Sequence, residues 1–142
     1  MLVVPAAALV GRLLAATGTH VSVYKTATCG CCGQWVAHMK SNGFDVDFEN
    51  VPDTALYRKK YGVPDAMQSC HTAFVDGYAI EGHVPAADVQ RLLKERPKAA
   101  GLAVPGMVSG SPGMEGPAPQ PYSVMLFTAD GKTSVYSKYP GK

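Results

Sequence analysis

Three of the four cysteines lie within four residues, in the run Cys29-Gly30-Cys31-Cys32, directly after the apolar run Val21-Ser22-Val23-Tyr24. Adjacent cysteines do not readily bridge each other, because a disulfide needs separated Cα atoms with converging Cβ vectors. Thiols crowded in this way are more typical of soft-metal binding or of thiol redox chemistry. A fold for this chain must therefore hold a thiol site just behind its first strand-like run, and Cys70 is the remaining thiol that the fold could bring there.

The size and charge of the chain narrow the class of protein. At 142 residues the chain fits one domain with a packed core. The formal net charge is only +2 and the basic residues are scattered. The short cluster Arg58-Lys59-Lys60 falls in an expected helix, so we interpret it as a solvated face. We therefore expect no nucleic-acid partner.

The first residues differ in composition from the rest of the chain. Residues 2–16 are almost entirely apolar, but a proline, a glycine and an arginine interrupt them, so the run is too short and too broken to span a membrane. It ends in small residues, as a secretory signal does, although a positively charged start is missing. We interpret residues 1–18 as a signal-peptide remnant, with an apolar N-terminal helix as the alternative, and residues 19–142 as a single domain. No stable membrane insertion is expected.

Hydrophobic patterns predict an ordered series of elements along the chain. The crossover between the first two strands makes them parallel, and the Asp76-Gly77 turn makes the last two antiparallel. This β-α-β-α-β-β-α order, with cysteines between the first strand and the first helix, resembles the thioredoxin/glutaredoxin fold, an α/β class with a mixed sheet flanked by helices. The expected strands are residues 20–25, 44–48, 72–75 and 78–81, and the expected helices are residues 34–41, 53–61 and 85–95.

The composition changes at residues 101–121, where Gly, Pro, Ser and Met dominate. This composition predicts a segment without regular structure, and so long a loop inside a compact domain is usually functional or disordered. We expect it to cross the domain and to act as a mobile lid. After it, residues 122–127 and 133–137 are expected to form a terminal β-hairpin.

The topology predicts which side chains meet. The first strand ends at the cysteine loop, and the antiparallel third strand begins at the same edge of the sheet, next to Cys70. The fourth strand returns to that edge just before His83. We therefore expect Cys29, Cys31, Cys32, Cys70 and His83 to gather beside the N-terminus of the first helix, which favours anions and lowers thiol pKa values.

The donor types favour copper over zinc. At a helix start the side chains of Cys31 and Cys32 point roughly 100° apart, so they suit bridging of several Cu(I) ions better than one tetrahedral Zn²⁺. Thioethers also select Cu(I), and Met107 and Met114 each follow a Pro-Gly pair without an apolar neighbourhood. Packing of the loop on the domain is the alternative role for both. The predicted metal ligands are Cys29, Cys31, Cys32, Cys70, His83, Met107 and Met114, and no catalytic residue is predicted.

The other histidines are predicted to lie outside this centre. By helical rise His38 is about 10 Å from Cys31, which favours a role on the helix surface. His71 follows Cys70, and because neighbours in a strand face opposite ways, we expect it to face away from the site. His20 is expected at an exposed strand end.

Taken together, the motifs resemble the CopG-type proteins of bacterial copper-resistance loci, over roughly residues 20–140. The resemblance implies a thioredoxin-like fold, a periplasmic location and copper binding through the cysteine cluster. It also implies copper ions as partners, with other periplasmic copper-resistance proteins as candidates. The matching motifs are Val23-Tyr24-Lys25, Cys29-Gly30-Cys31-Cys32, Gly62-Val63-Pro64, Ser69-Cys70-His71-Thr72-Ala73, Glu81-Gly82-His83-Val84-Pro85-Ala86 and Pro105-Gly106-Met107 with Ser111-Pro112-Gly113-Met114-Glu115.

Three activities are compatible with these residues. The first is a protein that stores, buffers or passes Cu(I), with or without a copper-linked redox step. The second is a thiol-disulfide oxidoreductase that uses Cys29 and Cys32. The third is a binding module with a structural zinc site. Replacement of the expected cis-proline loop by Ser69-Cys70-His71 weighs against the second activity, and the methionine loop weighs against the third. Whether the protein is an enzyme stays open at this point.

Overall fold

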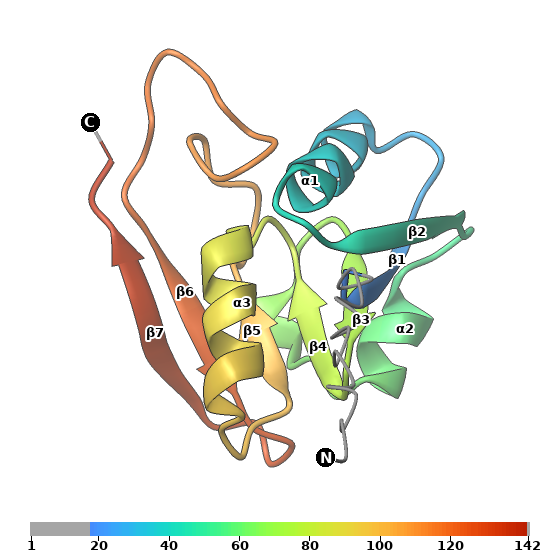
Figure 1. Cartoon of the computed structure of the whole chain (residues 1–142), viewed down its shortest axis with the longest axis vertical. Coiled ribbons are helices and arrows are strands. Elements are labelled where there is room, and N and C mark those ends of the chain that lie inside the picture. The colour runs from blue at the N-terminus through green and yellow to red at the C-terminus, as the bar shows by residue number, and fades with distance from the viewer. Residues whose placement is uncertain (1–17, 142) are drawn as a thin grey trace, which may run out of the picture.

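The computed structural model describes residues 18–141 (Figure 1). The predicted signal remnant therefore lies outside the described residues, apart from Gly18. The strands are β1 (His20–Lys25), β2 (Asp45–Asn50), β3 (Thr72–Val75), β4 (Tyr78–Glu81), β5 (Gly101–Ala103), β6 (Tyr122–Phe127) and β7 (Thr133–Tyr139), and the helices are α1 (Gly30–Ser41), α2 (Ala55–Lys60) and α3 (Ala86–Glu95), with a 3₁₀ turn at Asp65–Met67. No helix within residues 18–141 is both long and apolar enough to cross a bilayer.

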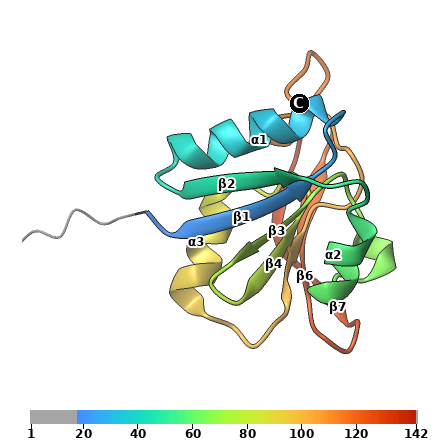
Figure 2. The same cartoon turned by 90° about the vertical axis from the view of Figure 1, so that its right-hand side faces the viewer.

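The seven strands form one mixed sheet in the order β2-β1-β3-β4-β5-β6-β7. Strand β1 pairs in parallel with β2 and antiparallel with β3, and β3 pairs antiparallel with β4, as the sequence predicted. Helices α1 and α3 lie on one side of the sheet and α2 lies on the other (Figure 2). The predicted α/β class with a mixed sheet flanked by helices is confirmed, and the first four strands are consistent with a thioredoxin-like arrangement.

The main core lies between the sheet and the two helices α1 and α3. The buried side of α1 consists of Cys32, Trp35, Val36 and Met39, at the spacing of one helical face. Trp35 is fully buried, and its indole Nε1 donates a hydrogen bond of 2.9 Å to the carbonyl oxygen of Val84. This bond satisfies the polar end of the largest buried side chain. The first turn of α1, which carries Cys31 and Cys32, is thereby seated firmly on the sheet.

Strand β5 was not predicted, because residues 101–121 were expected to lack regular structure throughout. Residues Gly101–Ala103 are instead buried and pair in parallel with β4 and antiparallel with β6. A Cβ atom at Gly101 would lie 1.8 Å from the carbonyl oxygen of Ala79. The glycine that indicated a loop is thus required by the close approach of two strands.

The remainder of the loop, residues 104–121, starts from β5 at the cysteine end of the sheet and has its own hydrogen bonds. The Gly110 amide donates to the Met114 carbonyl at 2.8 Å, and the buried Ser111 hydroxyl donates to the Val108 carbonyl at 2.6 Å. We call residues 104–121 the methionine loop.

The chain then forms the predicted terminal hairpin. The buried carboxylate of Asp88 on α3 accepts hydrogen bonds from the hydroxyls of Ser137 and Tyr139.

Candidate metal centre

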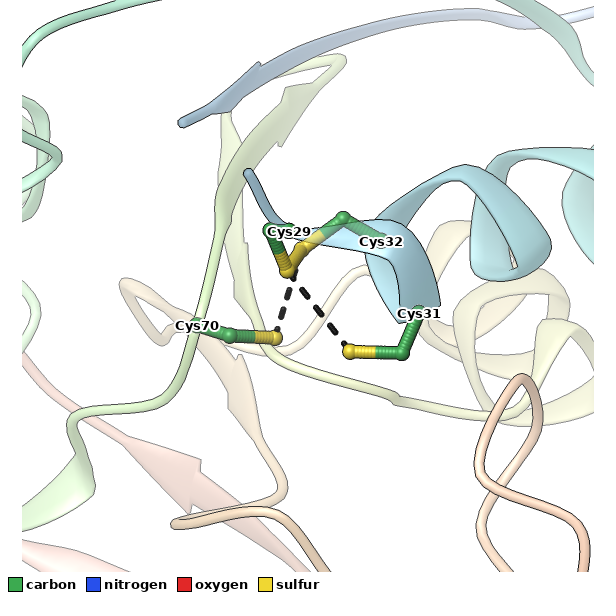
Figure 3. Close-up of side chains that lie close together, drawn as sticks. All are labelled: Cys29, Cys31, Cys32 and Cys70. Atoms are coloured by element: carbon green, nitrogen blue, oxygen red, sulfur yellow. Dashed lines mark hydrogen bonds between the residues drawn. A yellow bond between two sulfur atoms is a disulfide. The ribbon is translucent and has the colours of Figure 1, made fainter. Parts of the chain in front are cut away.

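The four cysteines meet where β1 leads into α1 and where β3 begins (Figure 3). Their Sγ atoms all lie within 4.8 Å of one another. The Sγ atom of Cys31 is 3.6 Å from that of Cys29, and the Sγ atom of Cys70 is 3.5 Å from that of Cys32. The predicted convergence of Cys70 with the other three thiols is therefore confirmed as geometry. Their role as metal ligands stays a prediction.

Cys29 and Cys32 form a disulfide, with their Cα atoms 5.5 Å apart. Cys31 and Cys70 are free thiols and are both partly exposed, whereas Cys32 is fully buried. The bond joins the residue preceding α1 to the first turn of that helix. The sequence spacing allowed this pairing but also allowed four free thiols.

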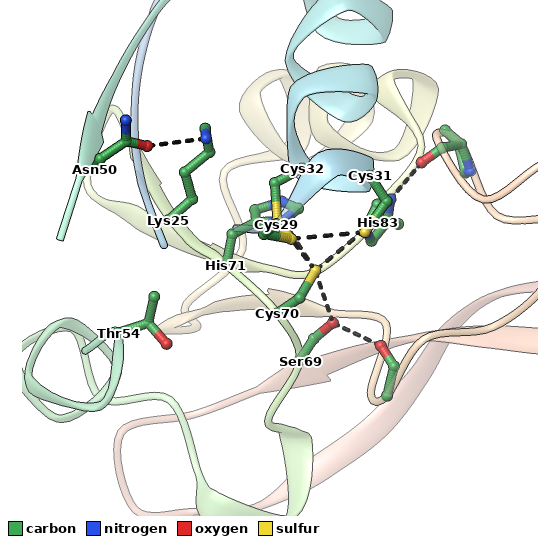
Figure 4. Close-up of a disulfide and its surroundings, with 12 residues drawn as sticks. Lys25, Cys29, Cys31, Cys32, Asn50, Thr54, Ser69, Cys70, His71 and His83 are labelled. Carbon is green, nitrogen blue, oxygen red and sulfur yellow. Dashed lines mark hydrogen bonds between the residues drawn. A yellow bond between two sulfur atoms is a disulfide. The ribbon is translucent and has the colours of Figure 1, made fainter. Parts of the chain in front are cut away.

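His83 reaches the cluster from the segment after β4, as predicted (Figure 4). Its Nε2 atom is 3.2 Å from the Cys70 Sγ, and its Nδ1 atom donates a hydrogen bond of 2.6 Å to the carbonyl oxygen of Pro112. Because a carbonyl only accepts, the neutral ring carries its hydrogen on Nδ1 and presents the Nε2 lone pair to the thiol. Burial lowers the pKa of His83, which favours the neutral ring. A ring nitrogen oriented through its partner nitrogen is the usual arrangement of a metal-binding histidine.

His71 contradicts the prediction that it faces away from the site. Its Nδ1 atom is 3.3 Å from the Cys70 Sγ, and its ring lies fully buried with its centroid 4.6 Å from that of Trp35. Strand β3 begins only at Thr72, so the side-chain alternation of a strand does not apply to Cys70 and His71. Burial lowers the pKa of His71 to about 3, so the ring is a neutral nitrogen donor. Its Nε2 atom is buried and has no hydrogen-bond partner among residues 18–141.

The segment around Cys70 is held by polar contacts on both sides. The Ser69 hydroxyl donates to the Gly106 carbonyl at 2.6 Å, and the Ser69 amide donates to a carboxylate oxygen of Glu81 at 3.0 Å. Thr72 donates from its hydroxyl to the other oxygen of Glu81. Burial raises the pKa of Glu81 to about 7. These contacts fix where the Cys70 sulfur lies.

Cys70 departs from the expected lowering of thiol pKa values. Burial is the main cause that raises the pKa of Cys70 to about 12, and the nearby Cys31 is the second cause. Removal from water disfavours the charged thiolate, so the lowering expected beside the helix N-terminus does not apply to Cys70. Without a bound cation Cys70 is a thiol, and a metal ion must displace its proton on binding.

The methionine loop lies against this centre. A Cβ atom on Gly113 would lie 3.0 Å from the His83 Nδ1 and 3.1 Å from the Cys31 carbonyl oxygen. At the other side of the site the carbonyl of Gly106 accepts from Ser69. The residues preceding Met107 and Met114 thus both contact the site. Met107 is 45% exposed and Met114 is partly buried, and their sulfurs remain predicted ligands.

The remaining two histidines lie apart from the cluster. The Nε2 atom of His38 accepts a hydrogen bond of 3.0 Å from the Ala86 amide, at the N-terminus of α3. His20 is exposed on β1, between the carboxylates of Asp45 and Asp47 on β2. Both placements agree with the predictions, although the sequence did not indicate that His38 caps another helix.

Comparison with known proteins identifies the family. A family model described as "Protein of unknown function, DUF411" matches residues 67–114, which include Cys70, His83 and both loop methionines. Two solved structures, named Copper resistance protein copG Form 1 and Form 2, are 45% and 44% identical to this chain. Each superposes with a TM-score of 0.82, covering 87% of this chain and 99% of its own. No curated protein matches the chain. With this identity over nearly the whole of both solved chains, the chain belongs to the CopG family of copper resistance proteins.

Proposed function

We propose that this protein binds copper as Cu(I), through a thiolate cluster that holds more than one ion, and that it does so in the periplasm. The single observation that carries the proposal is the gathering of four cysteine sulfurs within 4.8 Å of one another, with two neutral imidazoles beside Cys70. Thiolate and imidazole are donors that suit Cu(I), and thiolate bridges suit more than one ion. The solved relatives are named copper resistance proteins, which supports copper as the cargo.

The contacts of the sulfurs favour a multinuclear site over a single tetrahedral one. Cys31 lies against Cys29, whereas Cys32 is buried against Cys70, so the adjacent cysteines belong to different sulfur pairs. A single ion is therefore less well suited to binding Cys31 and Cys32 together than several ions bridged by the sulfurs. Several ions bridged by sulfurs use all four, and His83 is the nitrogen donor already oriented toward them.

The Cys29–Cys32 disulfide sets a redox condition on this function. The disulfide form offers two free thiols, and the reduced form offers four. A copper-linked redox step balances without a further reactant: the dithiol gives one electron to each of two Cu(II) ions, which yields two Cu(I) ions, the disulfide and two protons. The product ions then bind to the remaining soft donors or pass to a partner protein of the same compartment.

An anaerobic titration of metal-free protein with Cu(I) tests the proposal. We expect the fully reduced protein to bind more than one Cu(I) per chain and the disulfide form to bind fewer, because two sulfurs are removed from the donor set. Metal analysis after desalting gives the count, and a Zn²⁺ competition serves as the control for donor preference. A plateau at one Cu(I), or retention of zinc in preference to Cu(I), would contradict the proposal.

A thiol-disulfide oxidoreductase is the second candidate, and the disulfide itself favours it. Cys29 is partly exposed and Cys32 is buried, which leaves one sulfur accessible to an external thiol. Reduction of the disulfides of insulin by metal-free reduced protein tests this activity, with the Cys29→Ser variant as the control. Turnover comparable with that of a general dithiol reductase would favour this candidate over copper binding.

The methionine loop supplies a separate prediction. We expect the double change of Met107→Leu and Met114→Leu to weaken Cu(I) affinity or to speed oxidation of bound Cu(I), because it removes two thioethers and keeps the side-chain volume. The unfolding midpoint should change little. Chelator competition and air-oxidation rates are the measurements. If the variant binds and protects copper as the parent does, both residues only pack the loop.

A further inference from the structure

The four sulfurs form a compact cluster in which a free thiol contacts each sulfur of the disulfide. Cys31 touches Cys29 at 3.6 Å, Cys29 is bonded to Cys32, and Cys32 touches Cys70 at 3.5 Å. Each end of the disulfide therefore has a free thiol at van der Waals distance. Thiol-disulfide exchange requires just this kind of approach of a thiol sulfur to one sulfur of the bond. A second disulfide isomer is then reachable by a small movement of side chains.

We infer that Cys70 exchanges with the Cys29–Cys32 disulfide, so that the oxidised protein interconverts between a Cys29–Cys32 and a Cys32–Cys70 disulfide. The Cys70 sulfur attacks the Cys32 Sγ and forms the new bond. The Cys29–Cys32 bond breaks, and its electron pair leaves with the Cys29 sulfur. The proton of Cys70 passes to the His83 Nε2 and then to the released Cys29 thiolate. One disulfide is consumed and one is formed, so no oxidant or reductant takes part.

The surroundings select Cys70 as the attacking thiol over Cys31. The Cys70 sulfur lies 3.2 Å from the Nε2 atom of His83, which carries a lone pair because its Nδ1 donates to Pro112. A thiol beside a base that a third group orients is the general arrangement of an activated nucleophile. Cys31 has no imidazole hydrogen-bond partner within the described part of the chain.

The exchange changes which cysteines are free thiols and which segments of the chain the disulfide joins. In one isomer the disulfide lies within the start of α1, and the free thiols are Cys31 and Cys70. In the other isomer the disulfide joins α1 to the segment before β3, and the partly exposed Cys29 becomes free. External thiols or disulfides then meet a different sulfur. Because the exchange needs no metal, this inference stands or falls separately from the copper proposal.

Disulfide mapping of metal-free protein distinguishes the two isomers. Trypsin leaves Cys29, Cys31 and Cys32 in one peptide, residues 26–40, and Cys70 in another, residues 61–91. The Cys29–Cys32 disulfide stays inside the first peptide, whereas Cys32–Cys70 joins the two peptides. The experiment uses the Cys31→Ser variant, equilibrated in a glutathione redox buffer with a metal chelator. Free thiols are blocked with N-ethylmaleimide before digestion, and fragment spectra locate the bond.

We expect the Cys31→Ser variant to contain both disulfides, and the Cys29→Ser, Cys31→Ser double variant to form Cys32–Cys70 alone. We also expect His83→Gln to slow the appearance of the joined peptides after oxidation by on the order of 10²-fold, as for loss of a general base. Near-ultraviolet circular dichroism checks that each variant is folded. The inference is overturned if the double variant forms Cys32–Cys70 while the Cys31→Ser variant contains only Cys29–Cys32. It is equally overturned if the folded double variant leaves Cys32 and Cys70 unbridged.

Discussion

Replacement of Cys70 by serine is expected to abolish binding of more than one Cu(I) and to weaken the remaining site by more than about 100-fold, beyond the 10–100-fold usual for loss of an outer-shell partner. Cys70 contacts both imidazoles and the Cys32 sulfur, so it links the cysteines of α1 to the nitrogen donors. A serine hydroxyl has nearly the same shape but is a hard donor that Cu(I) does not favour. Anaerobic competition with a chromophoric Cu(I) chelator measures both the count and the affinity.

The matched control for this experiment is His20→Gln, which removes a nitrogen donor that lies outside the cluster. We expect it to bind as many Cu(I) ions as the parent, with the same affinity. A Cys70→Ser protein that matches the parent in the same titration would show that the three clustered cysteines suffice. The proposed four-sulfur site would then be wrong even though copper binding itself remained.

The largest effect on stability is expected for Gly101→Ala. A Cβ atom there would lie 1.8 Å from the carbonyl oxygen of Ala79, and this oxygen belongs to the strand that pairs with β5. Because backbone, unlike a flexible side chain, cannot move aside cheaply, β4 and β5 must separate. We expect the free energy of unfolding to fall by about 3 kcal/mol, at the upper end of the usual range for one substitution. Urea unfolding of the disulfide form measures it.

Gly33→Ala is the control for this prediction, because Gly33 is an exposed glycine in α1 with nothing within 4 Å of its Cβ position. Replacement of a helical glycine by alanine should stabilise the protein by about 0.5–1 kcal/mol. The two changes add the same methyl group in different surroundings, a close contact at Gly101 and open space at Gly33. They should therefore shift the urea midpoint in opposite directions. Equal midpoints for parent and Gly101→Ala would mean that β5 adjusts its position without cost.

Much of the sheet follows from sequence patterns that act locally. Strands β1, β3 and β4 have the predicted bounds, because alternation and the Asp76-Gly77 turn specify them. The meeting of Cys70 with the first three cysteines followed from strand direction alone, since antiparallel neighbours share an edge. Helix α1 begins four residues earlier than the predicted residue 34, so that Cys31 and Cys32 belong to its first turn.

The features that the sequence did not predict depend on contacts between distant segments. Strand β5 has three residues, too few to show a period, and its glycine is explained only by the neighbouring Ala79. His71 turns toward Cys70 because both residues precede β3, so the side-chain alternation of a strand does not govern them. The tautomer of His83 is set by Pro112, a residue 29 positions away.

Strand β5 has a wider consequence for how such a site can change. The methionine loop leaves from β5 and returns in β6, and these two strands are hydrogen-bonded neighbours. In topological terms it is the enlarged turn of a β-hairpin, with both of its ends fixed side by side. Doubling the length of such a turn costs only about 0.6 kcal/mol of closure entropy. Insertions or new donor residues in this turn would therefore alter what covers the sulfurs and leave the register of the frame intact, which makes it the segment through which ligand preference can diversify.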